Sequence, residues 1–322
     1  MTAPEAVLLL SFGGPGGPED VRPFLANVLR GRRASPARVD EVAAHYALFG
    51  GVSPLTAVTL SQARGLEARL RARGLALPVR VGMRNWHPYV ADTLAELSRG
   101  GVRRALGLVS AAGRCHSACG QYAEDVAAAR RTLRARGLAD VEVVLARDWQ
   151  AHPGYVAVWA AHVAEAVATL PEDVRGCARL VFTAHSIPQE MADRCMYERS
   201  FALLAESVSA MMGTTDFALV YQSRSGRPGD PWLGPDVCDY LREERARGLR
   251  AAVLCPIGFV CDHLEVLYDL DHQAGDLCRA LGLPMARART PNDAPAFLDA
   301  LADAAEAAWR WHARHRALPV VG

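Results

Sequence analysis

The chain has 322 residues, of which 51% are hydrophobic, and its 36 Lys and Arg almost balance its 35 Asp and Glu. This composition indicates a globular protein long enough for two domains, and it excludes a disordered chain. A net charge of +1 argues against the strongly basic face that nucleic acid requires, so we expect no nucleic-acid partner.

No apolar run approaches the roughly 20 residues of a membrane-spanning helix, so we expect no transmembrane segment. The first residues, Met1-Thr-Ala-Pro-Glu5, lack the basic stretch of a secretory signal. These features predict a cytoplasmic protein. Contact with a membrane surface stays open at this stage.

Short apolar runs alternate with helical patterns along the whole chain. In residues 1–150 we expect strands at 7–10, 77–82, 104–109 and 141–145, with helices between them. In residues 151–322 we expect strands at 179–182, 217–222, 251–256 and 286–289, and a final helix at 294–314. This order predicts an α/β protein of two Rossmann-like, doubly wound halves, each with a parallel four-stranded sheet, and a ligand cleft between them.

The first strand ends in a glycine-rich turn, Ser11-Phe-Gly-Gly-Pro-Gly-Gly-Pro18. Its spacing is not the GxGxxG of dinucleotide-binding proteins, and no ribose-binding acid can be identified, so a nucleotide-dependent dehydrogenase is a distant alternative. The glycines instead allow the backbone to lie close to a flat ligand.

Polar side chains follow in the next loops and helices. The basic cluster Arg30-Gly-Arg-Arg33 is either a solvated surface or a clamp for carboxylates, which arginine binds well. Ser53 places a hydroxyl next to the rigid Pro54, where it can serve as a hydrogen-bond donor.

The second half carries polar groups at two strand ends. His185, in Thr183-Ala-His-Ser-Ile-Pro188, follows the expected strand at 179–182, and ligands of α/β sheets bind at this edge. A buried strand expected at 253–260 runs into Cys261-Asp-His-Leu-Glu-Val-Leu-Tyr-Asp-Leu-Asp271, which is crowded with acids. A lone histidine is more often structural, but the two stretches together predict a site for a divalent metal and for displaced protons.

The chain resembles the ferrochelatase family, whose members insert ferrous iron into a porphyrin. The matching stretches follow the family's order and span most of the chain: Leu8-Leu-Leu-Ser-Phe-Gly-Gly-Pro15, Phe49-Gly-Gly-Val-Ser-Pro54, Gly82-Met-Arg-Asn-Trp-His-Pro88, Thr183-Ala-His-Ser-Ile-Pro188, Tyr221-Gln-Ser-Arg-Ser-Gly226 and 256–271. The resemblance implies that Fe(II) and a porphyrin are the substrates. It also implies that the final helix packs back on the first half.

The resemblance assigns His185 and Glu265 to the metal site and to catalysis, and it assigns porphyrin contacts to Arg30, His45, Tyr46, Ser53 and Tyr122. Asp269 lies four residues after Glu265, on the same side of a helix, where it could relay protons or hydrated metal. The pair could also be a solvated acidic helix face. The family often has another acid one turn later, where this chain has Gln273.

The porphyrin itself is left open between coproporphyrin III and protoporphyrin IX. Some coproheme-forming members have a tyrosine that ligates the product iron where this chain has Phe12, which can only pack against the macrocycle. The residues of the matching motifs resemble those of family members from high-GC Gram-positive bacteria, and this favours coproporphyrin III.

Some family members carry a [2Fe–2S] cluster on one mid-chain cysteine and three near the carboxyl terminus. The chain has eight cysteines but none in 309–322, so that arrangement does not apply. An internal set of Cys115, Cys119 and Cys195 with one more thiol is an alternative to ordinary reduced cysteines.

Other functions stay open besides iron insertion. A chelatase of the same fold for another divalent metal is one, because one His and one Glu encode metal choice poorly. A two-lobed protein that holds a tetrapyrrole without chemistry is another. Transient partners of the heme pathway would fit a ferrochelatase.

Overall fold

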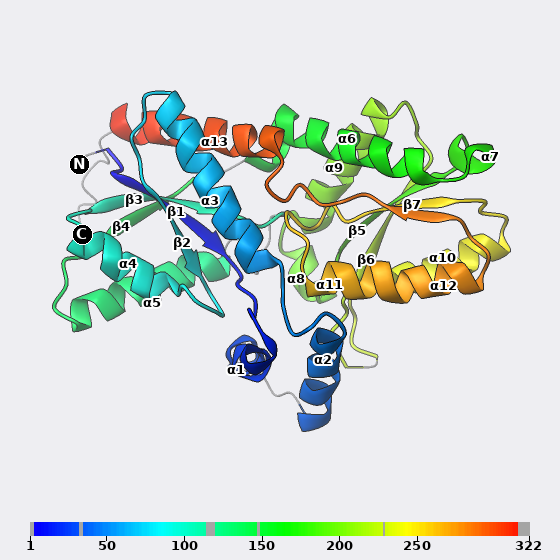
Figure 1. Cartoon of the computed structure of the whole chain (residues 1–322), viewed down its shortest axis with the longest axis horizontal. Helices are drawn as coiled ribbons and strands as arrows, with labels where there is room; N and C mark the ends of the chain where they lie inside the picture. Colours follow the sequence, from blue (N-terminus) through cyan, green and yellow to red (C-terminus); the bar gives the residue numbers. More distant parts are fainter. Residues whose placement is uncertain (1–2, 32–34, 114–119, 147–148, 228, 315–322) are drawn as a thin grey trace.

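The structure, a computed structural model, describes residues 3–31, 35–113, 120–146, 149–227 and 229–314 (Figure 1). Its described strands form two separate parallel sheets, one in each half of the chain. The prediction of an α/β fold with two four-stranded parallel sheets is therefore confirmed.

The first sheet has the strand order β2-β1-β3-β4, with β1 (Ala6–Ser11), β2 (Val79–Met83), β3 (Arg104–Val109) and β4 (Glu142–Leu145). Strand β1 is apolar at almost every position because both of its faces are covered. Val7 and Leu9 pack in the core cluster that contains residues of α3 (Leu55–Ala72). Leu8 and Leu10 pack in the cluster with α4 (Val90–Arg99) and α5 (Gln121–Ala135).

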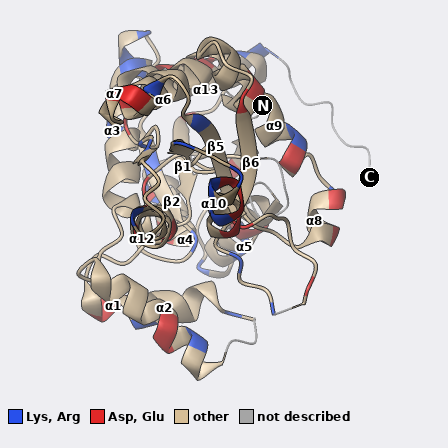
Figure 2. Cartoon of the chain, turned by 90° about the vertical axis from the view of Figure 1, so that its right-hand side faces the viewer, with Lys and Arg blue, Asp and Glu red and all other residues tan. Residues whose placement is uncertain are grey.

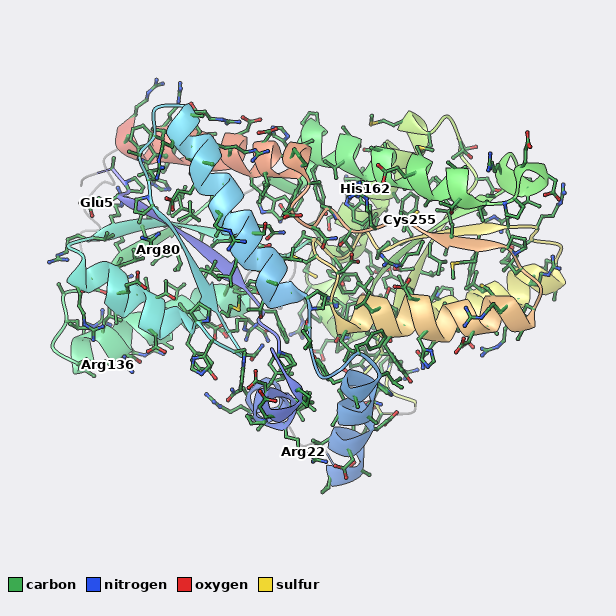
Figure 3. The ribbon with its side chains drawn as sticks, viewed as in Figure 1. Glu5, Arg22, Arg80, Arg136, His162 and Cys255 are labelled. Carbon is green, nitrogen blue, oxygen red and sulfur yellow. The ribbon has the colours of Figure 1, made fainter. Side chains whose placement is uncertain are left out.

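The second sheet has the order β6-β5-β7-β8, with β5 (Arg179–His185), β6 (Phe217–Gln222), β7 (Ala252–Cys255) and β8 (Met285–Arg287). Helices α6 (Pro153–Thr169) and α9 (Tyr197–Met211) share one core cluster with the sheet, and α10 (Val237–Ala246) lies in the cluster on its other face. The Nδ1 of His162 in α6 lies 3.0 Å from the carbonyl oxygen of Arg289, just past the end of β8 (Figure 3).

A helical segment after β7 carries the predicted acids. It begins with α11 (Leu264–Val266), continues as a π-helix, η3 (Leu267–Ala274), and ends as α12 (Gly275–Ala280). The prediction of a strand over 253–260 is wrong, because β7 ends at Cys255. Pro256 has no N–H to continue a ladder, and the N–H of Gly258 donates instead to the carbonyl oxygen of Thr183 at 3.0 Å.

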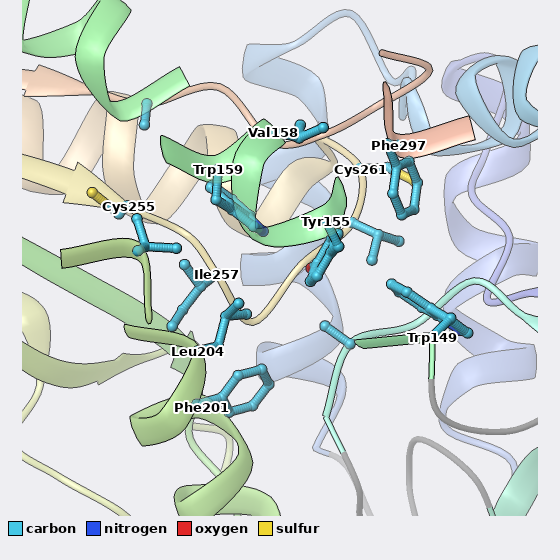
Figure 4. Packing of buried hydrophobic residues seen from close by; sticks show 14 of the residues in the cluster. Trp149, Tyr155, Val158, Trp159, Phe201, Leu204, Cys255, Ile257, Cys261 and Phe297 are labelled. Atoms are coloured by element: carbon cyan, nitrogen blue, oxygen red, sulfur yellow. The ribbon is translucent and has the colours of Figure 1, made fainter. Parts of the chain in front are cut away.

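The final helix, α13 (Pro295–Arg314), joins the two halves (Figure 1). It packs on α3 and α6, and its Asp299 and Asp303 pair with Arg69 of α3 and with Arg73, the C-cap of α3, at 2.6 and 2.5 Å. Aromatic rings fill the core beneath this junction, with the ring centroids of Trp149 and Phe297 5.6 Å apart (Figure 4). Three short elements and a pair of helices complete the described structure, and the short elements are α7 (Glu172–Arg175), α8 (Gln189–Asp193) and η2 (Trp149–Ala151).

Helices α1 (Pro18–Val28) and α2 (Pro36–Leu48) lie together outside both sheets, at the bottom of Figure 1. Ser35 caps α2 by accepting a hydrogen bond from the N–H of Arg38 at 3.2 Å. The pair shares a small core cluster with Leu264, at the start of α11. Among the described residues, no helix is both long and apolar enough to cross a membrane.

Candidate active site

His185 is the last residue of β5, at the carboxyl end of the second sheet. Its Nδ1 contacts the carbonyl oxygen of Ser186, and because a carbonyl oxygen only accepts, Nδ1 must carry the ring proton of the neutral imidazole. The lone pair of Nε2 is then available. Nε2 lies 3.8 Å from Oε1 of Glu265, so an imidazole nitrogen and a carboxylate face each other across a gap.

Glu265 stands in the short α11, which begins after its N-cap, His263. The ring Nδ1 of His263 caps this turn by accepting from the N–H of Val266 at 3.4 Å. The carbonyl oxygen of Glu265 accepts a hydrogen bond from Nε2 of Gln222 at 2.9 Å. The side chain of Glu265 is 48% exposed and thus accessible to a ligand.

Asp269 lies deeper, against the end of β6. Its Oδ2 accepts hydrogen bonds from the hydroxyl of Ser223 and from Nε2 of Gln222 at 3.3 Å. Burial raises the pKa of Asp269 to about 7, the hydrogen bond from Ser223 lowers it, and the charge of Glu265 raises it. A carboxyl group of this pKa can both take up and release a proton near neutral pH.

The two donors to Asp269 are themselves fixed by the fold. The buried hydroxyl of Thr183 donates to Oε1 of Gln222 at 2.7 Å, which turns the amide NH₂ toward Glu265 and Asp269. Ser223 has a φ of +61°, an uncommon conformation for a residue other than glycine. The left-handed backbone turns the chain at the end of β6 and brings its hydroxyl to Asp269.

Helices α2 and η3 contact each other through a pair of stacked rings. The rings of His45 in α2 and Tyr268 in η3 lie 3.7 Å apart and 17° from parallel. Burial lowers the pKa of His45, so its ring favours the neutral form. Tyr268 also contacts His272 one turn further along, with ring centroids 5.4 Å apart.

Aromatic residues of the first half form a second wall. Phe24 of α1 makes edge contacts with the rings of Phe12, Tyr46 and Trp86, at centroid distances of 6.2, 6.0 and 6.3 Å. Phe12 is 39% exposed, whereas Tyr46 is buried. Burial and the charge of Glu265 raise the pKa of Tyr46, so the hydroxyl of Tyr46 is held neutral close to that carboxylate.

Along the chain, Arg30 follows α1 and Ser53 follows α2. The exposed guanidinium of Arg30 donates to Oδ1 of Asn27 at 2.6 Å, and Asn27 in turn donates to the carbonyl oxygen of Asn85 at 3.1 Å. Ser53 is buried, and its N–H donates to the carbonyl oxygen of Pro15 at 2.9 Å. Ser53 therefore supports the glycine-rich turn. The two segments pack closely there, because a Cβ added to Gly14 would lie 2.6 Å from the Cβ of Ser53.

Tyr122 is placed differently from the other predicted contacts. It lies in α5, is only 3% exposed, and packs in the core behind the first sheet. The guanidinium of Arg84 covers its ring, 5.3 Å from the centroid, and pairs with Oδ2 of Asp125 at 2.7 Å. Arg84, which follows β2, is thus nearer to the surface than the tyrosine it covers.

The predicted cysteine set is described only at Cys195, because Cys115 and Cys119 lie outside the described residues. The thiol of Cys195 is partly buried and lies 3.6 Å from the carbonyl oxygen of Ala192. Within the described ranges, no three His, Cys, Asp or Glu side chains come together as a metal-binding group.

Sequence reasoning missed Gln222, Ser223 and Tyr268 as parts of this site. Gln222 and Ser223 belong to a matched stretch, 221–226, but an amide and a hydroxyl at a strand end carry no chemical signature of their own. The sequence did give a reason to include Tyr268 in the site, because Tyr268 lies between Glu265 and Asp269 in the acidic stretch.

Comparison with known proteins decides the family. The sequence profile described as Ferrochelatase matches residues 4–308. The chain belongs to the ferrochelatase family. It is therefore a metal–porphyrin chelatase of heme biosynthesis, with iron and a porphyrin as its substrates, as the resemblance of its motifs predicted.

Similar proteins include the coproporphyrin III ferrochelatase of Mycolicibacterium vanbaalenii, 47% identical over 302 residues, which cover 93% of this chain and 88% of the relative. The coproporphyrin III ferrochelatase of Mycobacterium marinum is 48% identical over 291 residues, covering 89% and 82%. Among solved structures, the sirohydrochlorin chelatase SirB from Bacillus subtilis subspecies spizizenii, in complex with cobalt, covers 95% of this chain and 96% of its own. Its TM-score is 0.55 at 9% identity, a likeness of fold alone.

Proposed function

We propose that this ferrochelatase inserts Fe(II) into coproporphyrin III, and that His185 and Glu265 form its metal site. The observation that carries the proposal is the pairing of His185 Nε2 and Glu265 Oε1 at 3.8 Å. The choice of porphyrin rests on the names of relatives that are 47 to 48% identical to this chain.

The pair suits a metal that must leave again. Fe(II) takes nitrogen and oxygen ligands readily, and a site with only two protein ligands holds it less firmly than a structural metal site would. The porphyrin nitrogens then replace the protein ligands. Because the same imidazole and carboxylate can also accept protons, either can receive the pyrrole protons that iron displaces.

Asp269 extends this path toward the end of β6. Its pKa of about 7 allows it to accept a proton from the pair and to release it again. The charge of Glu265 acts on the pKa of Asp269, which supports a coupled path between them. We therefore assign Asp269 the role of a proton relay.

The porphyrin contacts follow the walls of the site. We assign Phe12, His45 and Tyr46 to the macrocycle, because these rings lie on or next to the aromatic wall that shares a cluster with Leu264. Arg30, with its exposed guanidinium, is assigned to a propionate. Ser53 and Tyr122 complete the proposed set, although their burial means that they act by supporting the glycine-rich turn and Arg84.

Several properties of the whole protein belong to the same proposal. We place the protein in the cytoplasm, with transient partners of the heme pathway, and we divide it at about residue 150 into two halves. Of the thiols proposed for a [2Fe–2S] cluster, the described residues contain only Cys195, which by itself does not make a cluster site. Absorbance and electron paramagnetic resonance of the purified protein decide whether a cluster is present.

Anaerobic turnover of coproporphyrin III with Fe(II) tests the proposed function. We expect the porphyrin spectrum to convert to that of the iron product at a rate that saturates with both substrates. Conversion with Co(II) or Zn(II) but not with Fe(II) would support the chelatase for another metal. Porphyrin binding without conversion by any of the three metals would support a tetrapyrrole carrier and overturn the proposal.

A further inference from the structure

A groove runs along β2, the outer strand of the first sheet, between α3 and α4. Figure 2 shows these two helices on either side of β2. The groove has a volume of about 460 Å³ and shares no residue with the proposed metal site. Its lining includes the apolar Leu60, Ala63 and Pro88, the exposed Arg64, and Val81 of β2. A volume of this size is within the range of small-molecule sites.

The outward backbone groups of β2 find partners on both helices, with one exception. The N–H of Val79 donates to Oε2 of Glu67 in α3 at 2.8 Å. The hydroxyl of Thr93 in α4 donates to the carbonyl oxygen of Val81 at 2.7 Å, so Val81 faces away from β1. The N–H of a strand residue points to the same side as its carbonyl oxygen. Among the residues that the structure describes, none accepts a hydrogen bond from the N–H of Val81.

Glu67 shows how this groove holds a carboxylate. Besides accepting from the N–H of Val79, its carboxylate pairs with Arg71 at 3.1 Å and with Arg80 at 3.5 Å. A backbone N–H and two guanidinium groups therefore bind one carboxylate at this end of the groove. Hydrogen bonds between charged groups of this kind are the strong ones.

Helix α3 and strand β2 run in opposite directions along the groove. The hydroxyl of Thr56, in the first turn of α3, lies 3.7 Å from the sulfur of Met83, the last residue of β2. Glu67, three turns later in α3, contacts Val79, the first residue of β2. Positions between Thr56 and Glu67 therefore lie opposite positions between Met83 and Val79.

Arg64 and the N–H of Val81 come level with each other in this arrangement. Arg64 is three residues before Glu67, which is about 4.5 Å back along α3. Val81 is two residues after Val79, which is about 6.6 Å forward along β2. Arg64 forms no ion pair with another residue that the structure describes. The groove thus repeats the donors that hold Glu67, a backbone N–H and a guanidinium, beside apolar side chains.

We propose that this groove binds a fatty acid of medium chain length. Its carboxylate accepts hydrogen bonds from the N–H of Val81 and from the guanidinium of Arg64. Its aliphatic tail packs against Leu60, Ala63 and Pro88. Ligand sites combine an apolar lining with a few polar groups that fix the orientation of the ligand, and the groove has both.

Titration calorimetry of the full chain with decanoate tests the proposal. We expect one site with a dissociation constant at or below about 1 mM, since a small ligand in an open groove gains modest affinity. The amide resonance of Val81 in nitrogen–proton correlation spectra should shift as the site fills, because the carboxylate accepts from that N–H. Decanol, which has the same tail and no charge, should bind at least tenfold more weakly.

Two substitutions locate the binding in this groove. Arg64→Ala should weaken decanoate binding at least tenfold, whereas Arg131→Ala, the same change at an exposed arginine of α5, is the control and should leave it unchanged. Leu60→Glu places a carboxylate four residues before Arg64, the spacing that joins Glu67 to Arg71. This carboxylate competes with the ligand, so Leu60→Glu should bind decanoate at least tenfold more weakly than Leu60→Gln.

Circular dichroism verifies that each variant is folded. The proposal is overturned if the native protein shows no saturable binding up to about 10 mM decanoate, if the Val81 amide does not move, or if Arg64→Ala binds within twofold of native. Binding that persists in Arg64→Ala and is abolished by bound porphyrin would place decanoate in the active site and overturn it likewise. Because the readout is binding at the groove, none of these outcomes depends on iron insertion.

Discussion

Nε2 of His185 faces Oε1 of Glu265 at 3.8 Å, while the fold holds both residues by their backbone carbonyl oxygens. The hydroxyl of Tyr197 donates to the carbonyl oxygen of His185 at 2.8 Å, and Nε2 of Gln222 donates to that of Glu265 at 2.9 Å. Because these contacts use the backbone, they position both residues and still leave Nε2 and the carboxylate available for metal and protons.

Replacing His185 by alanine should lower iron insertion at least about 100-fold, because the site loses its nitrogen ligand and proton acceptor. Porphyrin binding, followed by quenching of protein fluorescence, should persist, because the aromatic wall comes from other elements. His272→Ala, an exposed histidine on the same helical segment as Glu265, is the control. Activity of His185→Ala within threefold of native would remove His185 from the metal site.

Replacing Ser223 by glycine should move the acid limb of the pH–rate profile upward. The hydroxyl of Ser223 lowers the pKa of Asp269, so its loss raises that pKa above its native value of about 7. The ionised form that accepts protons then appears only at higher pH. Glycine tolerates the φ of +61° at this position, so the backbone turn is kept.

The profile of kcat/KM between pH 5.5 and 9 measures this shift. Ser225→Gly, an exposed position in the same loop, serves as the control. An acid limb that stays in place in Ser223→Gly, or that moves downward, contradicts the relay role of Asp269.

Asp269 should also make stability depend on pH. Its pKa is raised from about 3.9 in the unfolded chain to about 7 in the folded protein. The folded state therefore binds this proton more tightly, and the resulting stabilisation, complete below pH 4, is lost as the pH rises through 7. The Asp269→Asn variant lacks this dependence. When the pH rises from 4 to 8, its free energy of unfolding should therefore increase by about 1–4 kcal/mol relative to that of the native protein.

Urea unfolding of both proteins at pH 4, 6 and 8 measures this difference in the free energy of unfolding. A difference that is the same at the three pH values would show that Asp269 is ionised throughout, and it would contradict the raised pKa.

Gln62 holds the two halves together from inside the core. Its Nε2 donates to the carbonyl oxygen of Asn292 at 2.7 Å, and its Oε1 accepts from the hydroxyl of Ser110 at 2.9 Å. Gln62→Leu removes both hydrogen bonds and should cost about 1–3 kcal/mol. Thermal unfolding compares it with Gln273→Leu, the same change at an exposed position, which should be near neutral.

Much of the fold follows from local patterns in the sequence. The apolar runs of β1 and β5 indicate strands that are covered on both faces, as Val7 and Leu8 show by packing in different clusters. The place of His185 at a strand end follows from the same pattern. The prediction of a strand over 253–260 was wrong because the apolar residues after Cys255 are buried in a turn that follows β7. Hydrophobicity alone does not distinguish a buried strand from a buried turn.

The rest of the site depends on contacts between distant segments. The spacing of Glu265 and Asp269 predicts an ordinary helix, and nothing in it reveals the π-helix that begins at Leu267. Whether Tyr122 points to a ligand or into the core depends on how α5 packs, and in the structure the ring lies beneath Arg84. The orientation of the Gln222 side chain depends on its hydrogen bond with Thr183, which lies on the neighbouring strand β5.

The central claim is most directly tested by anaerobic Fe(II) insertion into coproporphyrin III and protoporphyrin IX, measured side by side with the native protein. We predict that kcat/KM is at least about tenfold higher for coproporphyrin III, because its additional propionates give Arg30 and its neighbours more carboxylates to bind. Equal or faster insertion into protoporphyrin IX would contradict the claim and identify a chelatase of the final step of heme formation.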